Sequence, residues 1–399
     1  MKKIVSLLLC LMVCSFAACA SAGAGVKKMV NGNVLLPELM DHVLDAGTFT
    51  ELNYPFASEM AAKLFDNWGR CSAVVKTLPN GDTVVGRNMD FFITNKPAFV
   101  VRTKVPGCYE TVGLSYMDTM IPDHSMAVMN GIPSQLYDLI PFFSTDVLNS
   151  AGLYVEVNMR FGQKDENGNS YYGCSGTNPG AEQRVLAAQL TRYFGEHCAN
   201  VKEVVEYAKN LDIYTMKSDD KGWNLTFILA DAEGNYGLLE IAKNKVVFLE
   251  KQPIQTNFYV AEEFGKDQIY KCGLGRYDVL MRGRDEVKTE EDMYKLIDSV
   301  SYYQANFPER CRFDARTEIV DDVTGVTTAY VLAEENQPAV RAKMNATAEK
   351  LSNMTKQEIR NEAKYWDSSF TNVVNCNKRT LLVRFFEDEN KKLLLTVGK

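Results

Sequence analysis

From Cys71 onward, short apolar runs alternate with turn residues, a pattern that predicts antiparallel β-hairpins. The first hairpin runs through 71–75, turns at Pro79-Asn80-Gly81-Asp82 and returns through 83–85 to the polar stretch Gly86-Arg87-Asn88-Met89-Asp90. This hairpin returns Arg87 and Asp90 to the vicinity of Cys71. Similar patterns predict further strands at 99–102, 125–129, 151–158, 223–231, 236–241, 245–249, 329–332, 369–376 and 381–386.

Helices are predicted in two groups, by apolar residues at three- and four-residue spacing. In the first group, one helix follows an Asn178-Pro179 cap and runs through Tyr193, and the next is capped by Asn200. The second group holds a helix at 277–281 and one capped by Thr289. The helices with one apolar stripe are expected to pack on a sheet, so the fold class is α+β.

The one long apolar run lies at the N-terminus, where Lys2-Lys3 precede residues 4–18. This run is short for a membrane span and predicts a signal peptide over residues 1–22. The mature protein is therefore expected to be exported, either to the periplasm or by secretion. Cys19 offers an alternative lipid-anchor site, which would make the protein a lipoprotein.

Residues 23–70 carry two amphipathic stretches, at 37–44 and 57–68. They predict either helices that pack permanently on the domain or a propeptide that covers Cys71 until it is removed. The second hypothesis is preferred because it supplies a catalytic base, as argued below. Residues 71–399 are then expected to form one domain.

Composition and charge exclude several function classes. The hydrophobic fraction of 46% and the charged fraction of 24% are typical of a globular protein. A net charge of −7 without a basic block argues against nucleic acid as a partner. Histidine is scarce and no C-x-x-C pair occurs, so we expect no metal site. In an oxidising compartment up to three disulfides could form, with the pairing left open, among Cys108, Cys174, Cys198, Cys272, Cys311 and Cys376.

Cys71 has the setting of a nucleophile but needs a base, because a thiol of ordinary pKa, about 8.5, is only a few per cent ionised at neutral pH. None of the three histidines has the surroundings of a papain-type base; they are His42, His124 and His197. The α-amine of Cys71 itself, with a pKa of about 7.7–8.0, would serve. It exists only if the Arg70–Cys71 bond is cut. Asp90 would then hold the amine, and Arg87 would lower the thiol pKa.

The hairpin from Cys71 through Gly86-Arg87-Asn88-Met89-Asp90 resembles, in residues and spacing, the choloylglycine hydrolase and penicillin V acylase family of N-terminal-nucleophile (Ntn) hydrolases. Acid ceramidase and N-acylethanolamine acid amidase are more distant relatives. The resemblance implies a four-layer αββα sandwich and a reaction without cofactor or metal. It covers most of 71–399, except a polar helical insertion near 338–365.

The resemblance extends to three later residues. Asn158, at the end of a strand, is similar to a family asparagine that lines the oxyanion site, and Asn257 resembles a second amide donor. Arg276, within Gly275-Arg276-Tyr277, resembles a second site arginine. The resemblance thus implies a catalytic set of Cys71, Arg87, Asp90, Asn158, Asn257 and Arg276. The alternative is structural: a small core cysteine, an Arg87–Asp90 ion pair and a turn-capping asparagine.

The resemblance also implies the reaction class: hydrolysis of a linear, non-peptide amide in an N-acyl compound through a thioester. Conjugated bile acids and penicillin V are the expected substrates, with acyl-homoserine lactones and N-acyl lipids as alternatives. N-acyl lipids stay open because Asn158-Met159-Arg160-Phe161 is similar to the Asn-Glu-Arg-Phe of acid ceramidase. Part of the apolar stretch 120–143 is expected to wall the pocket. An inactive relative that binds an acyl compound is a further alternative. Family relatives are often homotetramers.

Overall fold

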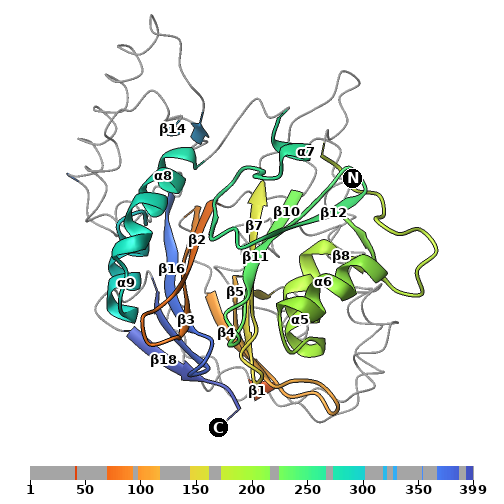
Figure 1. Ribbon diagram of the computed structural model, residues 1–399, viewed down its shortest axis with the longest axis horizontal. Coiled ribbons are helices and arrows are strands. Elements are labelled where there is room, and N and C mark those ends of the chain that lie inside the picture. The colour runs from red at the N-terminus through yellow and green to blue at the C-terminus, as the bar shows by residue number, and fades with distance from the viewer. Residues whose placement is uncertain are drawn as a thin grey trace, which may run out of the picture.

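The computed structural model describes twelve parts of the chain, and the statements below concern these parts. They are residues 41–42, 70–92, 98–116, 144–160, 172–215, 224–266, 273–301, 318–320, 327–329, 353, 366–385 and 392–398. Two large β-sheets pack face to face, each with helices on its outer face (Figure 1).

The first sheet has eight strands in the order β1-β4-β5-β6-β7-β10-β11-β12. Its neighbours pair antiparallel, except β1, which runs parallel to β4. The strands are β1 (Asp41–His42), β4 (Ala98–Thr103), β5 (Thr111–Tyr116), β6 (Ser144–Asn149), β7 (Tyr154–Arg160), β10 (Asn224–Ala230), β11 (Tyr236–Ala242) and β12 (Lys245–Glu250).

The second sheet has six strands in the order β13-β2-β3-β16-β17-β18, all antiparallel. They are β13 (Ile254–Gln255), β2 (Arg70–Thr77), β3 (Thr83–Phe92), β16 (Trp366–Asn375), β17 (Thr380–Phe385) and β18 (Lys392–Thr396). Two small sheets join β8 (Arg184–Leu186) to β9 (Asp212–Tyr214), in parallel, and β14 (Glu318–Val320) to β15 (Thr327–Ala329).

The alternation of side chains along β2 shows how the layers form. Cys71, Ala73 and Val75 belong to the core between the two sheets. Val74 points the other way, into a cluster with Met293 and other apolar residues of the outer helices. Successive residues of a strand point to opposite faces, so one strand serves both layers. The nucleophile candidate therefore faces the inside of the sandwich.

Helices cover the outer face of each sheet. Those on the six-stranded sheet are α8 (Leu274–Gly283) and α9 (Glu290–Asp298), and those on the eight-stranded sheet are α5 (Leu190–His197) and α6 (Val201–Asn210) (Figure 1). The short elements η5 (Ala187–Gln189), α7 (Glu262–Gly265) and η6 (Arg284–Glu286) complete the set. The predicted α+β class and the four-layer αββα order are confirmed.

Two predicted helix caps are present, and a third is wrong. Asn200 accepts a hydrogen bond from the backbone of Glu203, and Thr289 forms a capping box with Asp292. The helix expected after Asn178-Pro179 begins only at Leu190. The preceding residues instead form β8, which pairs with β9, and the Asp212 side chain accepts from the backbone N–H of Asn178 at 3.1 Å. This tertiary pairing overrides the local cap signal.

Several predictions fall on residues outside the described parts. These are the signal peptide, nearly all of the proposed propeptide, the apolar stretch 120–143, the strand at 125–129 and, apart from Asn353, the insertion at 338–365. Four of the six cysteines considered for disulfides are described and are free thiols: Cys108, Cys174, Cys198 and Cys376. Among described residues, no helix is long and apolar enough to cross a membrane, and no His/Cys/Asp/Glu group could hold a metal.

Candidate active site

Cys71 lies near the start of β2, between β13 and β3, with only 2% of its surface exposed. Its backbone is held at both ends. The N–H of Cys71 donates to Asn257 Oδ1 at 3.1 Å, and its carbonyl accepts from Arg276 Nη1 at 2.8 Å. Arg276 Nη2 also donates to Asn257 Oδ1, at 2.9 Å. Asn257 and Arg276 therefore form one clamp around the residue that the sequence marks as the nucleophile.

Gly273 makes the approach of Arg276 possible. It precedes α8 with a φ of 82°, which side-chain-bearing residues rarely adopt. A Cβ atom at this position would lie 2.7 Å from Thr256 Cβ and 2.8 Å from Arg276 Nη2. Neither distance is tolerable, so the clamp depends on the missing side chain.

We expect Gly273→Ala to destabilise the fold and to lower activity. The left-handed backbone costs about 1–2 kcal/mol, and displacement of Arg276 should reduce kcat/KM by roughly tenfold or more. Gly234→Ala is the matched control, because Gly234 has a φ of 86° but nothing within 4 Å of the added Cβ. Urea unfolding and amide hydrolysis measure both effects. Equal activity in the two variants would contradict the role given to Gly273.

The sulfur of Cys71 faces Met89 and Arg87. Sγ lies 3.4 Å from Met89 Sδ and 3.8 Å from Arg87 Nη2. Burial raises the pKa of the Cys71 thiol to about 12, with Glu156 and Asp90 adding to the rise and Arg87 and Arg276 opposing it. At neutral pH the buried Cys71 is therefore a protonated thiol in this structure.

Asp90 reaches the site from the opposite face of β3. Residues 87 and 90 point to opposite faces of a strand, so only Arg87 approaches the sulfur. Asp90 pairs in register with Arg70, accepts from Ser368 Oγ at 2.5 Å and lies 3.7 Å from Arg276 Nη1. It therefore lies beside the Arg70–Cys71 bond, at the end of Cys71 where an α-amine would form.

Asn158 enters from the eight-stranded sheet and is fully buried. Its Nδ2 lies 3.4 Å from the carbonyl oxygen of Thr256. Turned about its terminal bond, the same amide donates to Glu156 Oε1 at 2.5 Å and to Val157 O at 3.2 Å. Asn158 thus joins the loop that carries Asn257. The structure brings all six predicted residues together around Cys71 and Asn257.

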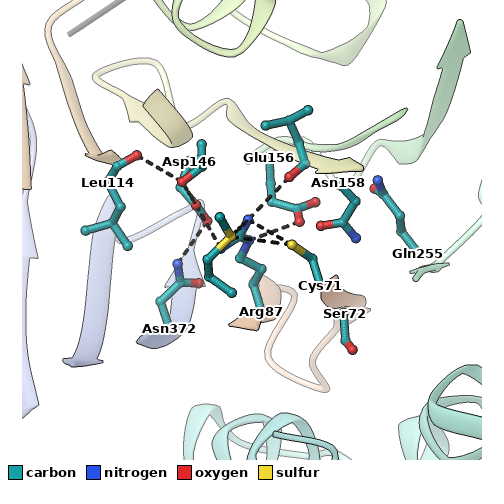
Figure 2. A network of polar contacts seen from close by, with 12 residues as sticks. Cys71, Ser72, Arg87, Leu114, Asp146, Glu156, Asn158, Gln255 and Asn372 are labelled. Carbon is teal, nitrogen blue, oxygen red and sulfur yellow. Dashed lines mark hydrogen bonds and ion pairs between the residues drawn. The ribbon is translucent and has the colours of Figure 1, made fainter. Parts of the chain in front are cut away.

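Sequence reasoning missed the partners of Arg87. Arg87 Nε donates to Glu156 Oε1 at 3.0 Å, and Nη1 lies 3.3 Å from Asp146 Oδ2 (Figure 2). These carboxylates come from β7 and β6, on the facing sheet. We call Cys71, Arg87, Asp146, Glu156 and Asn158 the inter-sheet seam. A signal was available, because Glu156 is a charged residue between Val155 and Val157, two positions before Asn158.

The two carboxylates of the inter-sheet seam differ in their surroundings. Asp146 accepts from Tyr154 Oη at 2.5 Å, Thr145 Oγ1 at 2.8 Å and Asn372 Nδ2 at 3.0 Å, besides its contact with Arg87. Burial raises the pKa of Glu156 to about 7, with Arg87 opposing the rise and Asp146 adding to it. Glu156 therefore titrates near neutral pH.

Arg160, also unforeseen as a site residue, supports the loop before Asn257. Its guanidinium donates to the carbonyl of Thr256 and to Thr226 Oγ1. Gln255 Nε2 reinforces the same junction by donating to the Thr226 carbonyl at 2.8 Å. Burial lowers the pKa of Arg160 to about 10, against the opposing effect of Glu240. This second buried cation fixes the path of residues 255–257 from the facing sheet.

Comparison with known families agrees with this geometry. Residues 71–261 match the model of the linear amide C–N hydrolases, choloylglycine hydrolase family. This segment belongs to the choloylglycine hydrolase family. The chain is accordingly a hydrolase of carbon–nitrogen bonds in linear, non-peptide amides. The choloylglycine hydrolase segment starts at Cys71 itself and ends before Arg276, so the second site arginine lies outside it.

Comparison with solved structures gives two variants of conjugated bile acid hydrolase from Clostridium perfringens. They are 14% and 11% identical to this chain, with TM-scores of 0.41 and 0.43, and each alignment covers 82% of this chain and 92% of the other. Penicillin V acylase from Agrobacterium tumefaciens is 13% identical, with a TM-score of 0.39, over 82% of this chain and 86% of its own. A search among curated proteins gave no match.

Proposed function

We propose that the chain is an exported cysteine Ntn hydrolase that cleaves the linear amide bond of an N-acyl compound through a thioester acyl-enzyme. One observation carries the proposal: the hydrogen bonds that hold Cys71 come from residues after it in the chain, Asn257 and Arg276. Removal of the segment before Cys71 would leave this clamp intact. The start of the family match at Cys71 supports the same position for the mature N-terminus.

Cutting the Arg70–Cys71 bond would turn the backbone nitrogen of Cys71 into a free α-amine. Asn257 Oδ1, which accepts from this nitrogen in the uncut chain at 3.1 Å, would continue to hold it. Asp90 lies beside the same bond and would supply a negative charge. The amine, with an ordinary pKa of about 7.7–8.0, would accept the Sγ proton without a histidine.

The reaction would then take two steps. Sγ attacks the amide carbonyl, and its proton moves to the α-amine, which passes it to the leaving nitrogen as the C–N bond breaks. Water, deprotonated by the same amine, attacks the thioester carbonyl; the C–S bond breaks, the ammonium returns its proton to Sγ, and the acid is released. Asn158 Nδ2 and the second hydrogen of Asn257 Nδ2, whose first serves Met159 O at 2.8 Å, would stabilise the oxyanion.

Conjugated bile acids and penicillin V are the substrates to test first, because the two kinds of solved structure found by comparison carry these names. Acyl-homoserine lactones and N-acyl lipids follow as alternatives. One experiment distinguishes an enzyme whose leader is removed on export from an inactive relative that only binds an acyl compound. In the second case, the chain would keep Arg70 attached to Cys71 and hydrolyse nothing.

The decisive experiment is intact-mass and N-terminal analysis of the purified mature protein, followed by the substrate panel. We expect a chain that begins at Cys71 and hydrolyses at least one of these amides. A chain that retains Arg70 and still hydrolyses amides would contradict the α-amine mechanism. A chain that retains Arg70 and is inert would favour the binding protein.

A further inference from the structure

The single positive charge of Arg87 is shared by two carboxylates and the sulfur of Cys71. The guanidinium is completely buried and contacts two buried carboxylates, Asp146 and Glu156, as well as the sulfur of Cys71 (Figure 2). Deep burial makes an uncompensated charge costly. If both carboxylates are ionised, one cation faces two anions and has no charge left to stabilise a thiolate.

The hydrogen bonds distinguish the two carboxylates. Asp146 accepts from three neutral donors as well as facing Arg87, so both of its carboxylate oxygens have hydrogen-bond donors. Glu156 is held through Oε1, by Arg87 Nε, whereas its buried Oε2 has no hydrogen-bond partner within the part of the chain that the structure describes. An oxygen without a donor is where a proton can reside at least cost.

We propose that Glu156 is a positioning residue that decides, through Arg87, how much positive charge reaches the sulfur of Cys71. When Glu156 is neutral, the positive charge of Arg87 can stabilise the Cys71 thiolate through Nη2. When Glu156 is ionised, it neutralises part of that charge, and the thiol form of Cys71 is favoured. This inference rests on the proposed function, since it concerns the nucleophile of the same site.

Charged and titratable groups around Glu156 come from four strands. They are Cys71 of β2, Arg87 of β3, Asp146 of β6, and Tyr154 and Arg160 of β7. Arg160 adds a second cation, but Glu240 lies within its electrostatic reach and offsets it. Tyr154 stays neutral, because burial raises the pKa of its phenol well above the ordinary value. Glu156 itself, with a pKa of about 7, can change its charge at neutral pH.

The test is the rate at which Cys71 is alkylated by iodoacetamide, followed by peptide mass spectrometry, in the wild type and in Glu156→Gln. Near pH 5.5 Glu156 is neutral in the wild type, so the two rates should be about equal. Near pH 8.5 the variant should react about tenfold faster, as expected for a thiol pKa lowered by roughly one unit. The α-amine titrates in both proteins and cancels from the ratio.

Glu156→Met is the second variant, because it removes the carboxylate without adding a polar group and leaves Arg87 balanced by Asp146. It should show the same pH-dependent ratio. Glu196→Gln is the matched control: Glu196 is also buried and paired with a buried arginine, Arg192 at 2.8 Å, but lies in α5. Its ratio to the wild type should stay at one throughout.

Three results would overturn the proposal. One is an alkylation ratio for Glu156→Gln that stays at one at both pH values. Another is a ratio that differs from one by the same factor at every pH, which is the mark of a merely structural role. The last is loss of folding in both Glu156 variants. Alkylation needs no amide substrate, so failure to find an amide that is hydrolysed would overturn the proposed function and leave this test intact.

Discussion

Replacing Cys71 by alanine should abolish amide hydrolysis, with kcat falling on the order of a thousandfold or more. No other described side chain contacts the position of Sγ as a nucleophile; the neighbours there are the thioether of Met89 and the guanidinium of Arg87. If the Arg70–Cys71 bond is cut by the protein itself, the variant should also keep its leader. Steady-state kinetics and intact mass measure both results.

Cys108→Ser is the control for this prediction. Cys108 is another free thiol, partly exposed and outside the inter-sheet seam. Its replacement should leave kcat and KM unchanged. Substantial activity in the Cys71 variant, at a level above trace contamination, would exclude Cys71 as the nucleophile and would require a different assignment of the site.

Asn257→Asp should lower kcat by roughly a hundredfold to a thousandfold, which corresponds to about 2.7–4 kcal/mol of barrier. The aspartate oxygen can still accept from the N–H of Cys71 and from Arg276. It cannot donate to Met159 O, where the amide now lies at 2.8 Å, nor to an oxyanion. An added negative charge near the reacting carbonyl would oppose oxyanion formation as well.

The matched substitution Asn210→Asp, at the exposed end of α6, should have no measurable effect on catalysis. Separate determination of kcat and KM decides the role of Asn257. A rise in KM with unchanged kcat would mean that Asn257 binds the substrate in its ground state and does not stabilise the transition state.

The fold could be predicted from the sequence wherever a local pattern has a local cause. The hairpin after Cys71 forms as expected because Asn80-Gly81 supply the turn and the flanking residues alternate. The capping box of Thr289 likewise acts within one helical turn. The helix predicted after Asn178 failed because its first residues pair with β9, from a segment more than twenty positions later. Local propensity carries no information about such a partner.

The candidate site shows the same difference between local and long-range contacts. The placement of Arg87 and Asp90 near Cys71 could be predicted because one hairpin carries all three residues. The contacts of Arg87 with Asp146 and Glu156 could not, because they depend on how the two sheets are set face to face. No pattern within either sheet fixes that placement. Glu156 is unusual in the sequence because it is a charged residue between Val155 and Val157. Its partner, Arg87, is revealed only by the three-dimensional structure.

The ion pairs of Arg87 with Asp146 and Glu156 join the two sheets and lie beside Cys71, the candidate nucleophile. Each of these residues thus has two tasks, and a substitution that alters the chemistry also loosens the contact between layers. In directed evolution, few substitutions at these positions would therefore be tolerated, since improved variants must first remain folded. Libraries confined to residues outside the seam avoid this double penalty and are the better starting point for changing the substrate range.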